Sequence, residues 1–378
     1  MTRVALGAGG AAWEHRTIAD LDAHPDVSLA RRCVDAADLL AVAQTGQCDV
    51  ALVDPGLAGL DLDIVHRLRD AGVRVVAVEG TGGVDPDALG IDRTIRPGRV
   101  GDLATEAPER VQRPASGGRM VAVWGPTGAP GRSTLAISYA AAAAAAGQRT
   151  VLVDADTYGG SIAQSLAVLD DVSALMAACR AANHGKVAEV DDHLVAVSDR
   201  LHLLTGIPRA DMWVHIRSRP FALVLEHLMS RYDLVVVDTG FGVESGASAA
   251  SSRDQVTVHV LETADVTFVV GRADPVGIAR LVRALADVEH LVASPRIVLN
   301  GMRGSLGWSE HDLTSALRQL SGHEPVAVLP WDQSAIDEAL MAGVPVREAT
   351  PGSAYALRVD MLQRQTAQVI GSGAPCSG

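Results

Sequence analysis

The first hundred residues alternate short apolar runs with longer stretches in which apolar residues recur every three or four positions. The runs predict buried strands and the longer stretches predict amphipathic helices. Because the two alternate, the pattern predicts a βα repeat with a parallel sheet over residues 1–100. In chain order the expected elements are 3–6, 14–23, 27–31, 36–44, 50–53, 62–71, 73–78, 86–89 and 93–95.

The periodic pattern stops at residues 101–118, where Gly, Ser and Pro punctuate the chain, and this stretch predicts a linker. Apolar runs return over 119–370, at 121–124, 151–153, 201–205, 232–238, 264–271, 296–299 and 325–330. Residues 173–230 are expected to be mostly helical apart from the run at 201–205, a last helix is expected at 354–370, and 371–378 should be disordered. The 378 residues therefore predict an α/β protein of two domains, the second with a mostly parallel sheet.

Residues 125–134 interrupt the second region with three Gly and two Pro. They join the apolar run at 121–124 to strong helix formers at 135–146. A glycine loop that leads into a helix N-terminus is an anion site, because unpaired N–H groups and the positive end of the helix dipole point the same way. The segment therefore predicts a phosphate site, with a plain βα turn as the alternative.

Three carboxylates and one amide follow apolar runs in the second region. Asp154 and Asp156 come after the run at 151–153, Asp238 ends the run at 232–238, and Asn300 follows 296–299. In open α/β sheets ligands bind outside the carboxyl ends of the strands, so these side chains are expected to face one crevice. For Asp156 a helix cap at a βα turn is the alternative.

The chain has 45 acidic and 32 basic residues, which gives a formal net charge of −13. This negative charge disfavours sequence-independent binding to nucleic acid. Only Lys186 among the basic residues is a lysine. The sequence has no apolar run of membrane-spanning length and no basic leader before an apolar stretch, and its four cysteines are scattered. We therefore expect a cytoplasmic protein without direct membrane insertion.

The order of strand, loop, helix and strand ending Asp154-Ala-Asp156 resembles the MinD/ParA family of P-loop ATPases, whose loop reads K-G-G-x-G-K-[ST]. The resemblance implies that ATP and Mg²⁺ bind. Asp156 would orient the attacking water, Asn300 would read the adenine edge, and the ion would lie among Ser133, Asp154 and Asp238. The nucleotide would be held by Thr127, Gly128, Ala129, Pro130, Gly131, Arg132, Ser133 and Thr134.

Two positions of the loop depart from that family. Thr127 stands where the family has its signature lysine, which in a nucleotide-closed homodimer reaches the phosphates of the other subunit. Arg132 stands at the phosphate lysine, where a bulkier guanidinium can still bind phosphate. Since Thr127 supplies no charge, the resemblance implies ATP binding with slow or absent hydrolysis, at most a weak ATPase.

The first region resembles the receiver domain of response regulators, a flavodoxin-like fold, with Asp54 at the phosphoacceptor place and Arg96-Pro97 at the family's Lys-Pro. The acidic pair that holds Mg²⁺ in receivers is missing, because that place reads Gly7-Ala-Gly-Gly-Ala-Ala. We therefore expect a pseudo-receiver, a docking or dimerising module that is not phosphorylated at Asp54.

A pseudo-receiver joined to a MinD/ParA-type domain with a variant loop resembles the CpaE/TadZ family. This resemblance implies a homodimer that positions pilus-assembly or secretion machinery, with recruitment to the membrane or pole by partners. Three alternatives stay open: a chromosome-partitioning ATPase, a division-site regulator acting in septum site determination, and a scaffold that never binds nucleotide.

Overall fold

The computed structural model describes residues 2–79, 84–91, 93–104, 117–168, 172–244 and 252–372. The chain divides into two compact units. Unit 1 comprises Met1–Ala115 with Arg180–Val190, and unit 2 comprises Ser116–Cys179 with Asp191–Gly378. Most of the predicted linker, residues 105–116, and residues 373–378 of the predicted tail lie outside the described residues.

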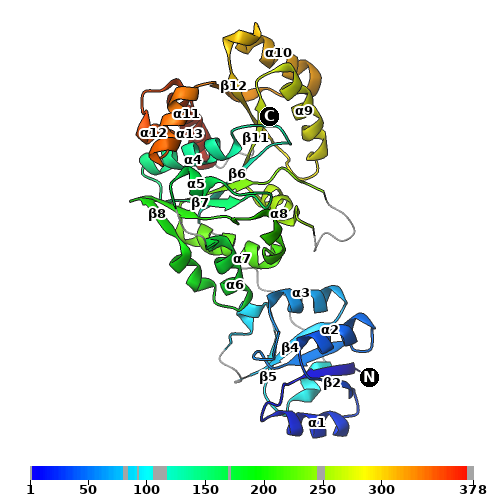
Figure 1. Ribbon diagram of the computed structural model, residues 1–378. Helices are drawn as coiled ribbons and strands as arrows, with labels where there is room; N and C mark the ends of the chain where they lie inside the picture. Colours follow the sequence, from blue (N-terminus) through cyan, green and yellow to red (C-terminus); the bar gives the residue numbers. More distant parts are fainter. Residues whose placement is uncertain are drawn as a thin grey trace. The chain divides into compact units, whose positions relative to one another are not determined.

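Unit 1 is built on a five-stranded parallel sheet with the strand order β2-β1-β3-β4-β5 (Figure 1). The order reverses between β1 and β3, so their carboxyl ends meet at a switch point of the sheet. The elements are β1 (Thr2–Gly7), α1 (Glu14–Ala23), β2 (Val27–Cys33), α2 (Ala36–Gln44), β3 (Val50–Val53), α3 (Leu62–Asp70), β4 (Arg74–Val78), η1 (Asp87–Leu89), β5 (Thr94–Ile95) and η2 (Val100–Ala104).

Both faces of the central strands β1, β3 and β4 are buried, which explains why these strands read as continuous apolar runs. Successive strand residues point to opposite faces, and they fall into two separate clusters. Ala5 packs in one cluster with Leu39 of α2, and Leu6 packs in the other with Leu21 of α1. Val100 and Leu103 of η2 belong to the second cluster, so ordered structure continues to residue 104, inside the predicted linker.

Unit 2 has an eight-stranded sheet with the order β13-β12-β11-β6-β10-β7-β9-β8, in which only β8 runs antiparallel to its neighbour. The predicted α/β class with a mostly parallel sheet is therefore confirmed. From residue 119 on, the elements are β6 (Arg119–Trp124), α4 (Arg132–Ala145), β7 (Thr150–Ala155), α5 (Ile162–Ser165), α6 (Ala174–Asn183), η3 (Val187–His193), β8 (Val195–Ser198), β9 (Leu201–Leu204), η4 (Ala210–His215), α7 (Ser218–Arg231), β10 (Leu234–Thr239), α8 (Gln255–Thr263), β11 (Val266–Arg272), α9 (Pro275–Asp287), β12 (Arg296–Met302), η6 (Gly304–Leu306), α10 (Glu310–Ser321), β13 (Pro325–Pro330), α11 (Gln333–Ala342), α12 (Val346–Ala349) and α13 (Ala354–Ser372). The end of α6 and the start of η3 fall within Arg180–Val190, the segment that belongs to unit 1.

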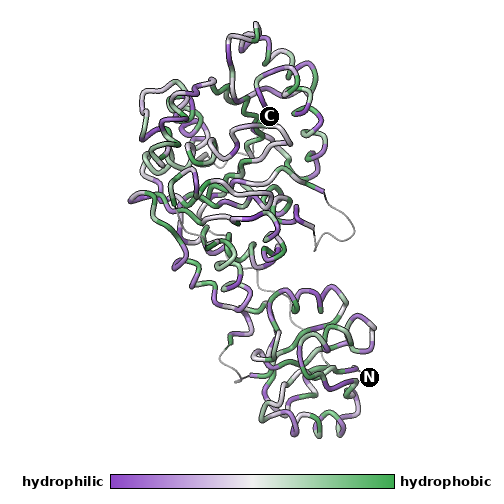
Figure 2. The backbone as a smooth tube through the Cα atoms, in the orientation of Figure 1, coloured by the Kyte–Doolittle hydropathy of each residue, from purple (hydrophilic) through white to green (hydrophobic). Residues whose placement is uncertain are grey.

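Helices cover both faces of the second sheet, with α4 and α13 on one face and α7 and α8 on the other (Figure 1). The tube in Figure 2 is predominantly apolar along the strands and polar along the outer sides of the helices. Helix α13 ends at Ser372, two residues beyond the predicted end at 370. The sheet and its helical layers place the carboxyl ends of β6, β7, β10 and β12 along one edge.

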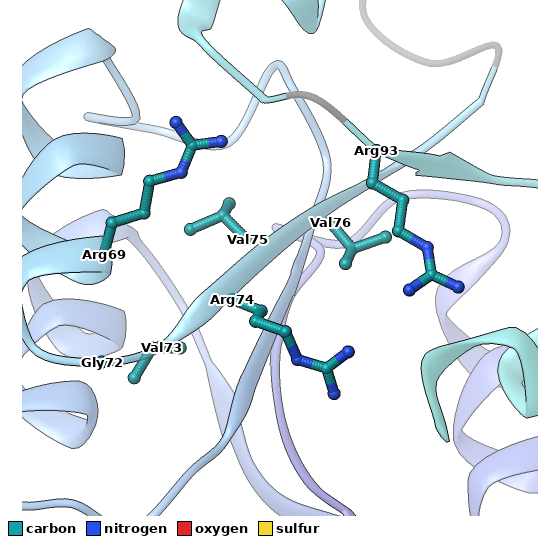
Figure 3. Close-up of a pocket in the computed structure, with 7 residues that line it drawn as sticks. All are labelled: Arg69, Gly72, Val73, Arg74, Val75, Val76 and Arg93. Carbon is teal, nitrogen blue, oxygen red and sulfur yellow. The ribbon is translucent and has the colours of Figure 1, made fainter. Parts of the chain in front are cut away.

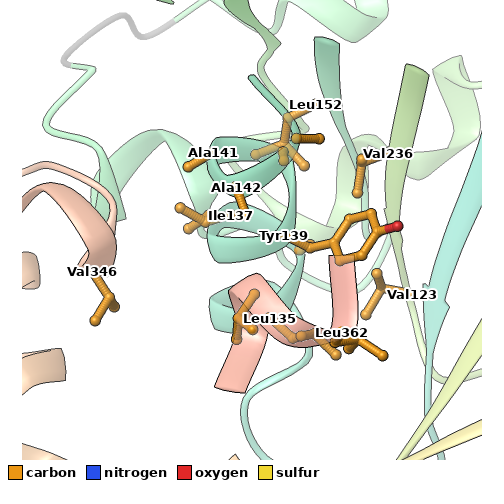
Figure 4. Packing of buried hydrophobic residues seen from close by; sticks show 14 of the residues in the cluster. Val123, Leu135, Ile137, Tyr139, Ala141, Ala142, Leu152, Val236, Val346 and Leu362 are labelled. Atoms are coloured by element: carbon orange, nitrogen blue, oxygen red, sulfur yellow. The ribbon is translucent and has the colours of Figure 1, made fainter. Parts of the chain in front are cut away.

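Helix α4 is the centre of the unit 2 core, and all its residues from 135 to 144 are buried (Figure 4). A helix that is apolar on every side must be enclosed, and the alanine run lets α4 lie close to the strands and to α13. Tyr139 projects from it toward the sheet and makes an edge-on ring contact with Phe268, with 5.1 Å between centroids. This packing fixes the start of α4, and therefore the loop before it, against β6.

Strand β8 lies where the sequence predicted mostly helix. It forms a hairpin with β9 through the two residues Asp199 and Arg200. Val195 and Val197 are half-buried and alternate with exposed residues. Only four residues carry this alternation, and a strand that short is decided by its pairing with β9 rather than by its own pattern.

Candidate functional site

The segment between β6 and α4 is a tight loop that depends on glycine. Gly128 and Gly131 have φ angles of +78° and +85°, a region that other residues rarely adopt. A Cβ atom on Gly131 would lie 2.1 Å from the Nδ2 atom of Asn300. Gly131 precedes α4 and has no side chain with which to cap it, so the first amide groups of α4 are left for solvent or an anion.

The Arg132 side chain points back into this loop. Its Nη1 atom donates to the carbonyl oxygens of Gly125 and Pro126 at 3.2 and 3.4 Å. Its Nη2 atom lies 4.0 Å from the Asp156 carboxylate, and the side chain is only 16% exposed. The Nε atom is buried without a hydrogen-bond partner among the described residues. The guanidinium therefore has donors directed into the loop that a phosphate could accept from.

Asp238 and Asp154 lie side by side at the ends of β10 and β7, where they are paired in register. Burial raises the pKa of Asp238 well above its usual range, and the neighbouring charge of Asp154 raises it further. A hydrogen bond with the Ser133 hydroxyl lowers this pKa, so the hydroxyl lies beside the Asp238 carboxyl group. The Oδ1 atom of Asp238 is buried and has no hydrogen-bond partner in the described structure.

An unpartnered carboxylate oxygen beside a hydroxyl at a strand end fits a divalent cation. In the described parts of the chain no group of three or more His, Cys, Asp or Glu side chains is arranged to hold a metal by itself. Mg²⁺ at nucleotide sites is usually held by one or two protein groups together with phosphate oxygens and water. Ser133 and Asp238 therefore fit an ion that is shared with a phosphate, and do not form a protein-only metal site.

Asp154 has a second role in the structure. Its oxygens accept hydrogen bonds from the amides of Ile162 and Asp156, at 3.1 and 3.3 Å. Burial raises its pKa to about 6, and these two amides lower it. A Cβ atom on Gly160 or Gly206 would lie 2.6 to 2.7 Å from the carboxylate group. Asp154 thus organises the loop after β7 as well as lying next to Asp238.

Asp156 faces the loop from the end of β7. One of its oxygens accepts the amide hydrogen of Tyr158 at 2.8 Å, which forms an Asx turn. Asp156 does not cap a helix, the alternative that the sequence left open, because the next helix, α5, begins at Ile162 after Ser161. The other oxygen is the one that lies 4.0 Å from Arg132. Asp156 therefore has both a structural hydrogen bond and a position at the loop.

No family model matches the sequence, and no curated protein matches it significantly. Solved structures do match it. The ParA family ATPase from Chlorobium tepidum TLS is 19% identical, with a TM-score of 0.57 over 65% of this chain and 98% of its own. The cell division ATPase MinD of Pyrococcus furiosus is 19% identical, with a TM-score of 0.53 over 67% and 99%. MinD of Pyrococcus horikoshii, complexed with Mg-ADP, is 18% identical, with a TM-score of 0.53 over 68% and 98%.

The chain has the fold of the MinD and ParA ATPases. The matched structures cover about two thirds of it, and at these identities the likeness concerns the fold. The MinD/ParA fold agrees with the predicted order of loop, helix and acidic strand ends. None of the helices in the described residues combines the length and apolar content needed to cross a membrane.

Asn300 reaches the loop from β12. Its Nδ2 atom donates to the Pro130 carbonyl at 2.9 Å, so it braces the turn before Gly131. The second Nδ2 hydrogen and the side-chain oxygen Oδ1 of Asn300 have no partner among the described residues and remain for a ligand. On the outer side of the loop lies Arg280 of α9, whose Nη1 atom is 3.4 Å from the Thr127 carbonyl. Sequence reasoning missed Arg280, because an arginine on a helix surface carries no motif.

Two segments of the MinD/ParA fold, after β7 and before α8, are joined by side chains that sequence reasoning also missed. The Tyr158 hydroxyl donates to Asp254 at 2.7 Å, and the Arg253 guanidinium lies 4.3 Å from the centre of the Tyr158 ring. Phe241 stacks on the same ring with 4.2 Å between centroids. Asp254 also accepts the Glu244 amide hydrogen at 2.9 Å. Tyr158 therefore connects the loop that carries Asp156 to the chain after β10.

We expect Tyr158→Phe to lower the free energy of unfolding by about 1–3 kcal/mol, because it removes a hydrogen bond to the buried carboxyl group of Asp254. Denaturant unfolding of the full chain measures this. Tyr232→Phe is the matched control, since its ring lies against His202 and its hydroxyl makes no hydrogen bond among the described residues. An equal loss of stability in both variants would contradict the role given to the Tyr158 hydroxyl.

Asp54, the predicted unphosphorylated aspartate of unit 1, is buried at the end of β3. Its Oδ2 atom accepts a hydrogen bond from the indole of Trp13 at 3.1 Å, and its Oδ1 atom accepts one from the Gly56 amide at 2.8 Å. Arg96 pairs with Glu79 at 3.3 Å. The Trp13 indole thus lies against the carboxyl group of Asp54.

Unit 1 also contains a cavity of about 310 Å³ beside β4 (Figure 3). Arg69, Arg74 and Arg93 line it together with valines of β4. The Arg74 guanidinium donates to the Leu103 carbonyl at 3.0 Å, and Arg93 donates to the Asp102 carbonyl. Arg74 and Arg93 thus connect β4 and its surroundings to η2, so the arrangement of these two side chains has a structural explanation.

Proposed function

We propose that the protein is an ATP-binding switch of the MinD/ParA type. One observation carries the proposal: the glycine loop, the inward Arg132 and the unpartnered Asp238 oxygen occur together at the ends of the adjacent strands β6 and β10. A phosphate chain satisfies all three, because it accepts from the loop amides and the guanidinium and shares a cation with the carboxylate.

In this proposal each residue has a defined task. The amides from Gly128 to Thr134 and the Arg132 guanidinium bind the phosphates, and Ser133 and Asp238 hold Mg²⁺, with Asp154 beside them. Asn300 orients adenine with its side-chain oxygen and with the Nδ2 hydrogen that is not bonded to the Pro130 carbonyl. ATP, when bound, supplies the transferable phosphoryl group. Asp156 lies where it can hold a water molecule in position.

We expect slow hydrolysis, because Thr127 provides no positive charge for the transition state. Losing one preorganised charge costs roughly a hundredfold in rate, about 3 kcal/mol. Thr127→Lys should raise the single-turnover rate by a similar factor, and Asp156→Ala should abolish the gain. Robust hydrolysis by the unmodified protein that Asp156→Ala removes would contradict this expectation.

Unit 1 serves, in our proposal, as a flavodoxin-like pseudo-receiver that docks or dimerises. The strand order β2-β1-β3-β4-β5 supports this, as it is one of the two common doubly wound orders. A carboxyl group that lies against the Trp13 indole, with Gly7-Ala-Gly-Gly-Ala-Ala at the place of the acidic pair that holds Mg²⁺ in receivers, is poorly placed to accept a phosphoryl group. The combination of this unit with a MinD/ParA fold supports a CpaE/TadZ-like homodimer.

The cellular task we infer is the positioning of a pilus-assembly or secretion machinery from the cytoplasm, with partners bringing the protein to the membrane or a cell pole. The likeness to MinD and ParA structures also supports a second task, division-site or chromosome positioning. Salt-dependent binding to duplex DNA, or sedimentation with vesicles in the presence of ATP, would favour this second task.

Isothermal titration of the full chain with ATP and Mg²⁺ tests the switch directly. We expect binding that weakens when Mg²⁺ is removed, and weaker binding in Arg132→Ala because the guanidinium contacts the phosphates. Titration with the same nucleotide after Lys186→Ala is the control, because Lys186 pairs with Glu189 at 3.1 Å on the surface. If no heat of binding is measured under any of these conditions, the switch is excluded and the scaffold that never binds nucleotide is the alternative that stays.

A further inference from the structure

Arg280 of α9 lies at the part of the loop where the expected lysine is missing. Its Nη1 atom is 3.4 Å from the Thr127 carbonyl oxygen. A Cβ atom on Gly128 would lie 2.0 Å from the same nitrogen, so the guanidinium occupies the space directly over the backbone of Gly128. The guanidinium is thus placed against the turn at Thr127 and Gly128.

The base of α9 is fixed, so this position is built into the fold. Asp274 caps the helix by accepting the Gly277 amide hydrogen at 2.7 Å. The same buried carboxylate pairs with Arg272, and with Arg303 at 3.8 Å. The Ala273 amide donates to the Asn300 carbonyl at 2.8 Å, which ties the start of α9 to β12. Arg280 therefore extends toward the loop from an anchored helix.

The charge of Arg280 is not balanced by a carboxylate among the described residues, and its side chain is exposed. Its one hydrogen bond is long and goes to a neutral carbonyl, so exchanging it for an anion costs little. Arg132, by contrast, has the Asp156 carboxylate 4.0 Å away. Of these two arginines, Arg280 therefore has the less neutralised charge.

We propose that Arg280 binds the terminal phosphate of the nucleotide within the same chain, a contact to bound ATP that is separate from the transition-state charge missing at Thr127. This inference rests on the proposed nucleotide site. A bidentate guanidinium from outside the loop would complement Arg132 from inside it. The protein should then prefer ATP to ADP without a contribution from a second subunit.

The experiment is titration of the full chain with ATP and with ADP, in the presence of Mg²⁺. Arg280→Ala should weaken ATP binding about tenfold to a hundredfold, as expected for a charge-assisted contact, and ADP binding much less. Arg280→Lys should recover part of the loss because it restores the charge. Arg283→Ala on the same helix is the matched control: Arg283 is also exposed, and it should leave both affinities unchanged.

The outcomes separate this inference from the function on which it rests. If the unmodified protein binds neither nucleotide, the proposed function fails. If it binds ATP and Arg280→Ala binds equally well, only the role of Arg280 is overturned. An equal loss for ATP and ADP would also overturn it, because a contact to the terminal phosphate must discriminate between them.

Discussion

Asp238→Asn should make the nucleotide-free protein more stable and at the same time abolish the effect of Mg²⁺ on nucleotide affinity. Burial and the Asp154 charge oppose ionisation of Asp238, and its Oδ1 atom has no partner in the described structure. An amide of the same shape removes that cost, so we expect a gain of about 1–3 kcal/mol in unfolding free energy near neutral pH. Denaturant unfolding and titration with ATP measure the two effects.

The gain should grow with pH. The folded protein holds protons on Asp154 and Asp238 above the ordinary carboxyl pKa of 3.8, and unfolding releases them. Stability must then fall as pH rises, since the native state binds more protons than the unfolded chain. For Asp154 the fall extends from about 4 to about 6, the folded pKa. Asp238→Asn removes one of the two like charges and should flatten this slope.

Asp211→Asn is the control for a change from Asp to Asn. Asp211 pairs with Arg209 at 2.8 Å on the surface, and its side chain is 68% exposed. Such an exposed pair contributes little, so we expect no measurable change in stability and no change in slope. Destabilisation by Asp238→Asn would show that the carboxylate is structural. Mg²⁺-dependent affinity that persists in this variant would show that Asp238 does not hold the ion.

The sequence predicted those parts of the site that depend on local chain signals. Consecutive residues are enough to identify the glycine loop, the helix after it and Asp238 at a strand end. The parallel sheet then brings these features to the same edge. The inward direction of Arg132 followed only from the structure, because it depends on the carbonyls of Gly125 and Pro126.

The remaining parts could not be predicted, because they depend on pairs of residues far apart in sequence. Arg280 lies 153 positions from Thr127, and Tyr158 lies 96 positions from Asp254. Neither pair forms a sequence motif, and nothing in the sequence distinguishes Arg280 or Tyr158 from an ordinary surface residue. The same reason applies to β8, whose four residues form a strand only because β9 is beside them.

Gly131→Ala should cost the protein most of its nucleotide affinity. Gly131 has a φ of +85°, and a new Cβ would meet the Asn300 amide at 2.1 Å. Either the loop or Asn300 must move, and both hold groups assigned to the nucleotide. A displacement of about 1 Å at such a site can cost on the order of a hundredfold in function, so we expect a loss of this size in ATP affinity by titration.

Gly147→Ala separates the strain of the backbone from the displacement of the loop. Gly147 lies just after the other end of α4 with a φ of +97°, and a Cβ there would meet nothing within 4 Å. Both substitutions place alanine in the left-handed region, at a cost of about 1–2 kcal/mol in stability. Only Gly131→Ala adds the collision with Asn300. If both variants lose stability but only Gly131→Ala loses ATP affinity, the geometry of the loop determines binding; equal affinities would place the nucleotide elsewhere.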